Sequence, residues 1–305
     1  MSVRLERLRA RAAILRALRG HLDAADYLEV ETPLAVPCPG LDVHLAALEV
    51  RGLGAPRWLA TSPEYQMKRL LVEGLPRIYQ IGKCFRRGEL GRHHEPEFTM
   101  LELYRAHAGA EEVMADTEAL VAHAARAVLG GTVLPSGVDV APPWERITVE
   151  DAFRAHAGVD VHDILPDEAR FFELLIDRVE PALEARRAPV FLVRWPASMA
   201  SLARLCPDDA RWADRFEAYV GGLELCNGFG ELTDPVEQRA RFERDLAKRR
   251  EAGLDVYPLD ERFLEALARG MPPSGGNAIG VDRLVMAITG AAHIEEVLAF
   301  PQAHL

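Results

Sequence analysis

Hydrophobic residues at the start of the chain follow the spacing of an α-helix. Leu5, Leu8, Leu15 and Leu22 would share one face of a helix that we expect to cover most of residues 2–25. Arginines fill the opposite face, which is typical of a helix side in contact with solvent. The leucines suit either packing within the chain or contact with a second subunit, and the pattern leaves both possibilities open.

Apolar runs in the rest of the chain predict strands in the centre and helices around them. We expect strands near residues 45–50, 57–61, 77–85, 97–104, 191–195 and 278–282, and helices over 64–73, 111–129, 235–252, 260–269 and from about 283. Gly221-Gly222 between two apolar runs predicts a two-residue hairpin turn. Residues 130–190 hold a proline-rich loop and two helices. The pattern indicates an α+β fold, with a central, mainly antiparallel sheet flanked by helices, in a single domain covering 1–305.

Composition narrows the class of protein. The chain has 305 residues, 49% apolar and 27% charged, as in a soluble globular protein with a substantial core. A net charge of −11 argues weakly against a broad nucleic-acid surface. No apolar run reaches the roughly 18 residues of a membrane span, and the four cysteines, without CxxC spacing, favour reduced thiols over a zinc site. We therefore expect a cytoplasmic protein without membrane contact.

The segment 85–104 carries the richest chemistry. A strand ends on Arg86, a charged loop follows, and a second strand returns with Phe98, Glu102 and Tyr104 on one face. Attack of a carboxylate on the α-phosphorus of ATP builds negative charge, which an arginine fork stabilises. An aromatic ring and a guanidinium can also hold adenine. The segment predicts ATP-dependent carboxylate activation, with an ordinary charged hairpin as the alternative.

Glycines near the C-terminus indicate a second point of contact with a ligand. The segment 275–283 contains Gly275, Gly276 and Gly280 and ends on Arg283. No Lys-Ser/Thr pair follows, so a Walker-type phosphate loop is excluded. The glycines favour close approach of the backbone to a ligand, with Arg283 as a second candidate for the nucleotide. A glycine-rich turn with a solvated arginine is the alternative.

The hairpin 216–231 carries carboxylates at metal-binding spacing. Across a two-residue turn, Glu217 and Glu224 lie diagonally on one face, roughly 7–8 Å apart at their backbones. Such a pair can hold Mg²⁺ that also binds phosphate, or can simply be solvated. Asn227 and Glu231 have the opposite parity. They reach the same pocket only if a β-bulge intervenes, and we expect it at Gly228 or Gly230.

Ser62 and Glu64 precede the predicted helix over 64–73. They either cap this helix or contact the substrate.

The order of these segments resembles the three signature motifs of class II aminoacyl-tRNA synthetases. The runs 94–104 and 224–232 resemble the lysyl branch, and the resemblance covers nearly the whole chain. The motif-1 helix begins at about residue 2, so we expect no anticodon-binding domain. The stand-alone paralogues of this branch, the elongation factor P–(R)-β-lysine ligases, are the nearest resemblance. Segment 62–72 and Ala278, where synthetases usually carry glycine, also fit them.

The resemblance implies roles for particular residues. Arg86 and Arg283 would be the catalytic arginines, with Phe98 and Arg283 on either side of adenine and His94 near the outer phosphates. Glu217 and Glu224 would hold Mg²⁺. The further nucleotide contacts implied are Gly88, Glu89, Glu95, Leu225 and Gly280. The implied substrate contacts are Ser62, Glu64, Glu102, Tyr104, Asn227, Glu231 and Ala278. Gly88 stands where synthetases commonly have Glu, and Glu95 where they often have Asn.

The resemblance also implies a reaction and partners. A lysine isomer, (R)-β-lysine, would be activated by ATP as the adenylate and transferred to a lysine side chain of elongation factor P. A methyl group at Ala278 would favour β-lysine over α-lysine by a limited factor. The family implies a homodimer that does not bind a tRNA anticodon. The alternatives are an enzyme that charges tRNA or another acceptor with α-lysine, and a non-catalytic synthetase-like regulator.

Overall fold

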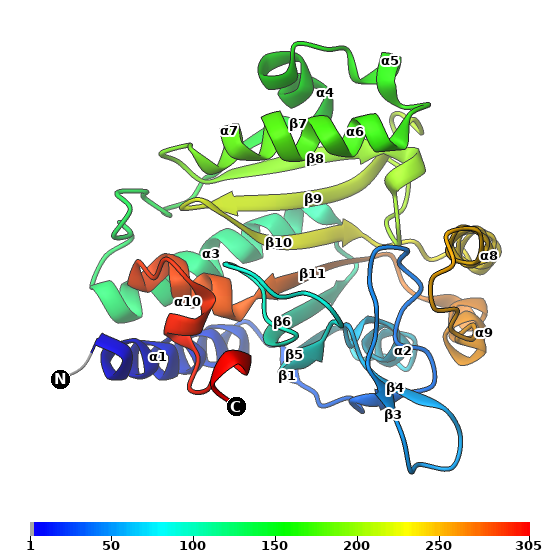
Figure 1. Cartoon of the computed structure of the whole chain (residues 1–305), viewed down its shortest axis with the longest axis horizontal. Helices are drawn as coiled ribbons and strands as arrows, with labels where there is room; N and C mark the ends of the chain where they lie inside the picture. Colours follow the sequence, from blue (N-terminus) through cyan, green and yellow to red (C-terminus); the bar gives the residue numbers. More distant parts are fainter. Residues whose placement is uncertain (1–2) are drawn as a thin grey trace.

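A large twisted sheet organises the chain (Figure 1). The computed structural model describes residues 3–305, and in them the sheet has eight strands in the order β1-β5-β6-β11-β10-β9-β8-β7. The strands are β1 (Leu28–Glu29), β5 (Arg77–Phe85), β6 (Glu97–Ala106), β7 (Glu145–Thr148), β8 (Val190–Pro196), β9 (Trp212–Val220), β10 (Leu223–Gly230) and β11 (Ser274–Gly280). The outermost pairs, β1–β5 and β7–β8, are parallel, and the other pairs are antiparallel. The predicted α+β fold is confirmed.

Three helices pack on one face of this sheet. They are α1 (Val3–Ala24), α3 (Ala110–Leu129) and α10 (Val281–Thr289), and their apolar sides form one core with the strands. Helix α1 exists as predicted, but its buried residues are Ile14, Leu18 and Leu22. Leu5 is 51% exposed. Near the N-terminus the helix extends beyond the sheet (Figure 1), so Leu5 is not part of the core of this chain, and contact with a second subunit stays a prediction.

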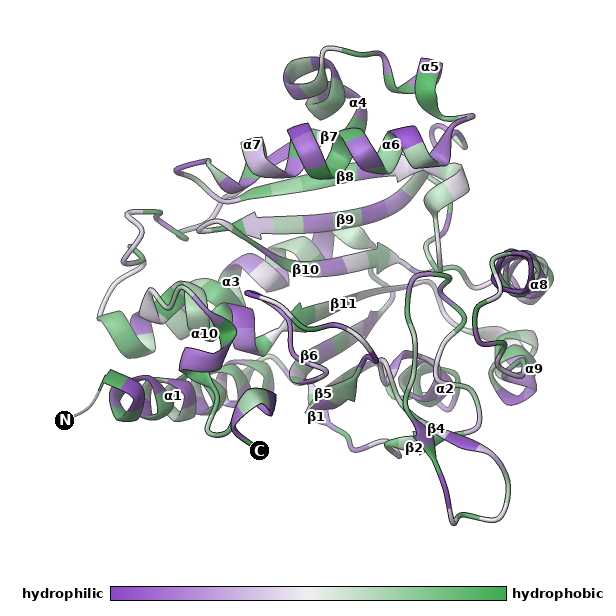
Figure 2. Cartoon of the chain, viewed as in Figure 1, coloured by the Kyte–Doolittle hydropathy of each residue, from purple (hydrophilic) through white to green (hydrophobic). Residues whose placement is uncertain are grey.

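A second helical group covers one end of the sheet. Its helices are α2 (Glu64–Val72), α8 (Pro235–Glu251) and α9 (Glu261–Gly270), which share a core with Tyr65, Phe242 and Phe263 at its centre. Most of α8 is hydrophilic (Figure 2), so only a narrow stripe of this helix packs inward. A small sheet of β2 (Ala35–Val36), β4 (Arg57–Leu59) and β3 (Glu49–Val50) lies beside the group.

Short helices cover the edge formed by β7 and β8. They are α4 (Val149–Ala152), α5 (Val161–Ile164), α6 (Glu168–Leu174) and α7 (Glu180–Glu184), with π-helical turns at Phe153–Ala157 and Leu175–Val179. This region was predicted as only two helices. The remaining short 3₁₀ segments are Ala197–Met199, Ile294–Val297 and Gln302–His304.

The junction between β11 and α10 differs from the predicted strand over 278–282. The strand ends at Gly280 and the helix begins at Val281, which places Asp282 and Arg283 in the first helical turn. The buried Asp282 carboxylate accepts a hydrogen bond from the Thr99 backbone amide at 2.7 Å and pairs with Arg11 at 2.5 Å. A carboxylate in the first turn also favours the helix start, because it complements the helix dipole.

The strand predicted at 45–50 begins only at Glu49, because residues 45–48 are irregular and continue a loop over residues 39–46. The buried guanidinium of Arg249 holds this loop by donating to the backbone oxygens of Asp42 at 2.5 Å and Leu45 at 3.0 Å. The backbone oxygens of Asp42 and Leu45 thus accept hydrogen bonds from a side chain and not from the backbone of a neighbouring strand.

All four cysteines are free and buried, as expected for reduced thiols. Within residues 3–305, no helix is both long and apolar enough to cross a membrane.

Candidate active site

Two rows of side chains cross the central strands on the face opposite α1, α3 and α10. In the first row the paired positions are Glu102 on β6, Ala278 on β11, Asn227 on β10 and Glu217 on β9. The second row consists of Tyr104, Gly276, Phe229 and Arg215 on the same four strands. The small residues Ala278 and Gly276 occupy the centre of each row. Ala278 forms the floor of a depression between polar and aromatic walls, whereas Gly276 leaves room for the Glu231 carboxylate and the Tyr104 ring at one end of it.

A β-bulge in β10 brings the hairpin residues to this face. The register changes between Glu224 and Cys226, so Glu224 lies opposite Tyr219 while Asn227 lies opposite Glu217. A bulge was predicted, but at Gly228 or Gly230. It occurs at Leu225, whose side chain is buried. The extra residue reverses the parity after Glu224, and this allows both carboxylates and Asn227 to face the same cavity.

One end of the depression is acidic. Ser62 donates to Glu102 at 2.7 Å, and the Tyr104 hydroxyl donates to the other Glu102 oxygen at 2.5 Å. The Ser62 hydroxyl also accepts from the Glu64 backbone amide at 3.0 Å. Ser62 therefore satisfies a backbone amide at the start of α2 and orients a buried carboxylate, and its contact with a substrate stays a prediction.

Glu64 and Glu231 complete this acidic end through Lys68. The Lys68 ammonium lies 2.5 Å from a carboxylate oxygen of each. Burial raises the pKa of Glu102 to about 7 and that of Glu231 to about 8, against the lowering effect of Lys68. A Cβ atom at Gly276 would lie 2.3 Å from a Glu231 oxygen, so only glycine fits beneath this carboxylate.

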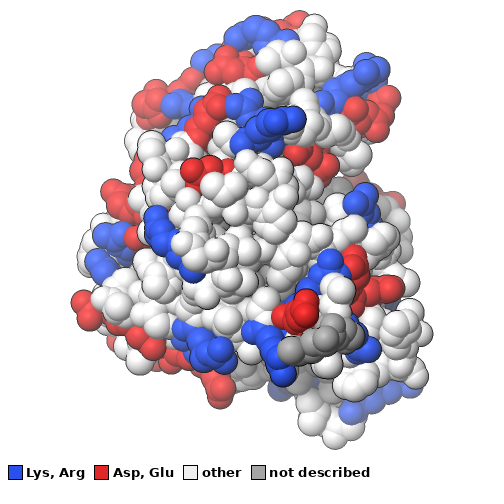
Figure 3. Space-filling view, turned by 90° about the vertical axis from the view of Figure 1, so that its left-hand side faces the viewer, with Lys and Arg blue, Asp and Glu red and all other residues white. Residues whose placement is uncertain are grey.

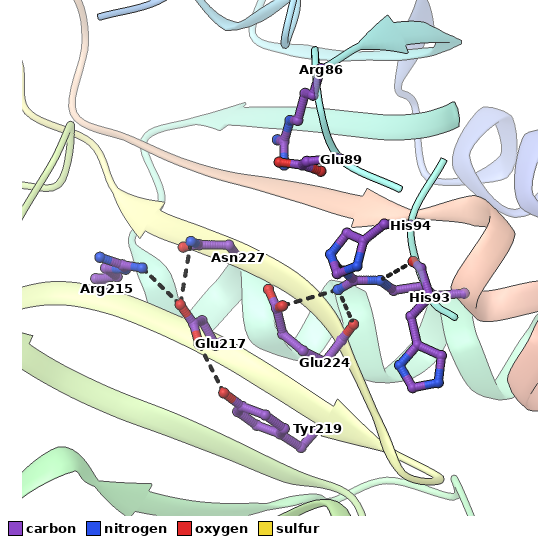
Figure 4. A network of polar contacts seen from close by, with 10 residues as sticks. Arg86, Glu89, His93, His94, Arg215, Glu217, Tyr219, Glu224 and Asn227 are labelled. Atoms are coloured by element: carbon purple, nitrogen blue, oxygen red, sulfur yellow. Dashed lines mark hydrogen bonds and ion pairs between the residues drawn. The ribbon is translucent and has the colours of Figure 1, made fainter. Parts of the chain in front are cut away.

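The other end of the depression is lined by basic and aromatic groups from the β5–β6 hairpin. The Arg86 guanidinium lies 5.1 Å from the centre of the Phe98 ring and 3.7 Å from Glu89. Its Nε is buried and has no hydrogen-bond partner. Figure 4 shows Arg86 and Glu89 across the cavity from Glu217, Glu224 and Asn227. Arg86 lines both cavities, and a guanidinium in this position suits an anionic ligand.

Arg283 approaches the same end from the first turn of α10. Its guanidinium lies 3.0 Å from the Glu224 carboxylate and 2.7 Å from the His94 Nε2. Burial and the nearby Arg283 charge lower the pKa of His94. His94 is therefore a neutral acceptor for the arginine, and it holds Arg283 beside Phe98 and Gly280 along the cavity.

Glu217 and Glu224 differ in their surroundings. Glu217 is buried, accepts from Arg215 at 2.7 Å and from the Tyr219 hydroxyl at 3.1 Å, and burial raises its pKa to about 7. Glu224 pairs with Arg283 and is more exposed. Within residues 3–305, no three His, Cys, Asp or Glu side chains are arranged to hold a metal ion by themselves. A cation at this pair would need further ligands, which phosphate oxygens can supply.

The acidic and the basic ends belong to two adjoining cavities. Arg86, Met100, Asn227 and Ala278 line both of them. The Oδ1 atom of Asn227 is buried without a partner at this junction. The first cavity has Ser62, Glu64 and Arg215 on its walls, and the second has Phe98, Glu224 and Arg283. Predicted residues from four separate segments thus line two adjoining cavities, whereas Glu102, Tyr104, Glu217 and Glu231 are buried and are not among the lining residues.

Gly88 and Glu95, two of the predicted nucleotide contacts, differ in their surroundings. Gly88 is exposed in the turn after Arg86 and has a φ of 85°, which favours glycine. Glu95 is buried and lines the second cavity. One of its carboxylate oxygens accepts from the Gln302 backbone amide at 3.2 Å, while the other has no partner. Glu95 therefore also ties the C-terminal segment to the site.

Sequence reasoning missed three residues of the site. Arg215 alternates with Glu217 and Tyr219 along β9, so strand parity was a usable signal. Phe229 follows Asn227 in the same way once the bulge is placed. Lys68 lies one helical turn after Glu64, and the i, i+4 spacing was a signal for the ion pair.

The sequence matches the family of class II tRNA synthetases (D, K and N) over residues 2–304. The chain belongs to this family. It is 40% identical over 325 residues to a lysine–tRNA ligase from Bacillus subtilis (strain 168), with 96% of this chain and 63% of the relative covered. Lysine–tRNA ligases from Halalkalibacterium halodurans and Moorella thermoacetica are 37% and 38% identical over 319 and 318 residues. The alignments cover 96% and 95% of this chain, and 62% and 64% of those relatives. The chain therefore spans somewhat less than two thirds of their length and resembles the lysyl branch of the family.

Proposed function

We propose that this protein activates (R)-β-lysine with ATP and transfers it to a lysine side chain of elongation factor P. The observation that carries the proposal is the pair of adjoining cavities, one beside the acidic residues and the other lined by arginines. The acidic end suits the ammonium groups of a diamino acid. The arginine-lined end suits the triphosphate of ATP. The substrate carboxylate would then lie at the junction, beside Arg86 and Asn227.

The arginine-lined end fits ATP through its donors and rings. Arg86 would bind the α-phosphate with its free Nε, and Phe98 and Arg283 would hold adenine between them. His94, as a neutral acceptor, orients Arg283 for this contact. Glu89, Glu95, Leu225 and Gly280 surround the same cavity, together with His93. Glu217 and Glu224 fit Mg²⁺ only together with phosphate oxygens, and the ion would neutralise charge on the leaving pyrophosphate.

The first chemical step needs no general base, because the substrate carboxylate is already ionised. Its oxygen attacks the α-phosphorus, the bond to the β-phosphate oxygen breaks, and pyrophosphate leaves. The protein contributes positioning and fixed positive charge. In the second step the amine of the acceptor lysine attacks the acyl carbon of the adenylate, and AMP leaves.

A lysine-activating enzyme that charges tRNA is the second candidate. The similar proteins from Bacillus subtilis and Moorella thermoacetica are named lysine–tRNA ligases, which favours this candidate. Both candidates share the adenylation step and differ in the acceptor. A non-catalytic regulator is disfavoured, because both arginines of the nucleotide end remain in place.

The test measures activation and transfer separately. Pyrophosphate exchange with (R)-β-lysine and α-lysine reports activation, and we expect a higher kcat/KM for the β isomer. Intact mass of elongation factor P after incubation with enzyme, ATP and each isomer reports transfer. Aminoacylation of tRNA without a mass increase of elongation factor P would replace the proposed acceptor. Absence of exchange with either isomer would contradict activation of lysine altogether.

We also propose a homodimer. The face that carries the ends of α1 and α10 has a broad area without charged side chains, ringed by charged ones (Figure 3). The exposed Leu5 of α1 and Val133, 51% and 57% accessible, are compatible with such an interface. Sedimentation velocity over a range of concentrations would test this, since a monomer at micromolar concentration would contradict it.

A further inference from the structure

Lys68 is a charged side chain buried completely behind the acidic end of the cavity. Its side chain has 0% exposure, and it extends from α2 toward the end of β10. It does not belong to the residues that line the cavity. Its ammonium bridges Glu64 and Glu231, at 2.5 Å from each, and lies 5.9 Å from the centre of the Tyr104 ring. A buried lysine with two carboxylate partners needs a reason beyond packing, because its desolvation is costly.

The charges that face Lys68 come from three elements. Glu64 lies on the same helix, Glu102 and Tyr104 lie on β6, and Glu231 follows β10. Ser62 and Tyr104 donate only to Glu102, so they add no charge. The cluster of Glu64, Lys68, Glu102 and Glu231 therefore has three carboxylates and a single cation.

The other charged residues that line the cavity have partners outside this cluster or lie at its mouth. Arg215 pairs with Glu217 at 2.7 Å, and Arg86 lies near Glu89 and Phe98. Asp42 is exposed at the cavity mouth, where it accepts from the His44 backbone amide. None of them has a contact with the cluster that would cancel its charge.

We propose that Lys68 is a positioning residue that sets the charge of the substrate pocket to match a ligand with two ammonium groups. When the ligand is bound, its ammonium groups replace the protons on the buried carboxyl groups, and Lys68 with three ionised carboxylates then has a net charge of −2. Two ammonium groups cancel this charge, and the carboxylate of the same ligand is left for the arginine-lined end. A ligand with one ammonium group would leave a buried negative charge without a partner. The inference rests on the proposed function and adds a physical basis for the choice of a diamino acid.

Lys68 also fixes the geometry of the two carboxylates that it bridges. Glu64 is attached to α2 and Glu231 to the end of β10, so the ammonium joins two elements across the pocket. Without this cation, repulsion among three buried carboxylates favours proton uptake and displacement of their side chains. A protonated or displaced carboxyl group is a poorer acceptor for an ammonium group.

The test is a calorimetric binding cycle with the lysine isomers and 6-aminohexanoate, which has one ammonium group. Lys68→Met should weaken lysine binding by at least tenfold, while Lys68→Arg retains most of the affinity. Glu231→Gln leaves a net charge of −1 and should reduce the preference for lysine over 6-aminohexanoate. Adding Lys68→Met to Glu231→Gln returns the charge to −2, so it should strengthen lysine binding and restore that preference.

Charge matching predicts that Lys68→Met weakens lysine binding in the unaltered protein and strengthens it in the Glu231→Gln protein. A purely structural role of Lys68 does not predict this difference. If Lys68 only supports packing, Lys68→Met weakens lysine binding in both backgrounds, and the inference is overturned. An unchanged affinity in the single Lys68→Met variant also overturns it. Lys83→Met is the matched control, because Lys83 on β5 is 42% exposed and pairs with Glu97 at 3.2 Å. Failure of the unaltered protein to bind any lysine isomer would instead contradict the proposed function.

Discussion

At the scale of single residues, Arg86 and Arg87 form a natural pair for comparison. Arg86 faces Phe98 with a free buried Nε, whereas the exposed Arg87 side chain pairs with Asp255 on the surface. Removing a fixed donor from a developing anion typically costs about 10²–10³ in rate. We expect Arg86→Ala to reduce pyrophosphate exchange by this factor. Arg87→Ala should leave it within about twofold. Full exchange activity in Arg86→Ala would contradict the α-phosphate assignment.

A second residue-scale prediction concerns the methyl group of Ala278. Ala278 lies between Glu102 and Asn227 in the row across the sheet and lines both cavities. Removing the methyl group gives an amine at the α position more room. We expect Ala278→Gly to shift the ratio of kcat/KM values toward α-lysine by about tenfold, since one methyl group gives limited discrimination. An unchanged ratio with both isomers would mean that Ala278 does not select the isomer.

Residue types and parity alone predicted much of the site. The alternation of Phe98, Glu102 and Tyr104 placed them on one face, because side chains alternate strictly along a strand. The same reasoning applied to β9 would have found Arg215. It could not determine that Lys68 reaches Glu231, since these residues are 163 positions apart and meet only when α2 packs beside the end of β10.

At the scale of elements, the bulge in β10 shows the limit of sequence patterns. Glycine is the usual sign of a bulge, and Gly228 and Gly230 were therefore the expected places. Both glycines are instead required by close packing, because a Cβ at Gly228 would lie 2.2 Å from the Phe216 ring. The bulge occurs at an apolar residue, where local sequence carries no signal. The sequence indicated a bulge only because Glu217, Glu224, Asn227 and Glu231 were expected to face one pocket.

The loop over 39–46 is the element whose conformation depends on one side chain. Arg249 is 1% exposed and donates to backbone oxygens of Asp42, Val43, Leu45 and Asp255, and its guanidinium lies 4.7 Å from the Tyr257 ring centre. A buried acceptor left without a donor costs about 1–3 kcal/mol. We therefore expect Arg249→Met to lower the unfolding free energy by about 2–4 kcal/mol.

The same variant should affect the substrate end more than the nucleotide end. Several residues of the loop line the first cavity only. Arg249→Met should raise the KM for the amino acid and speed protease cleavage within 39–46, with little change in the KM for ATP. Arg250→Met is the control, because Arg250 is the exposed neighbour on α8. Equal effects on both KM values would show a general loss of structure instead of a loop effect.

At the scale of the whole molecule, helix and strand patterns predicted the fold class and the order of elements. They did not predict the assembly of the two cavities, whose walls include the loop over 39–46, α2, the β5–β6 and β9–β10 hairpins, and β11. Such contacts join distant segments, and only tertiary packing decides them. Tertiary packing also decides which residues of α1 are exposed. The leucine pattern predicts a helix, but only packing against the sheet decides which leucines are buried.

The buried carboxylates give the whole molecule a pH-dependent response to its substrate. Burial raises the pKa of Glu102 to about 7 and that of Glu231 to about 8, whereas both are near 4.5 when exposed. Protons on these groups therefore stabilise the folded, ligand-free protein fully below about pH 4.5, and this stabilisation declines as the pH rises and is gone above pH 7 to 8. In the lysine-bound form, ammonium groups take the place of these protons. The stability of the bound form therefore does not decline in the same way as the pH rises.

It follows that lysine stabilises the fold more at pH 8 than at pH 6. Each displaced proton makes the Kd fall by about tenfold per pH unit within this window, or about 1.4 kcal/mol of extra stabilisation at fixed excess lysine. The increase in Tm on adding lysine should therefore be several degrees larger at pH 8. Other titrating groups contribute to both forms and cancel in the difference. 6-Aminohexanoate, with one ammonium group, should show a smaller pH dependence. An equal or smaller lysine shift at pH 8 would mean that these carboxylates are not the ones that receive the ammonium groups.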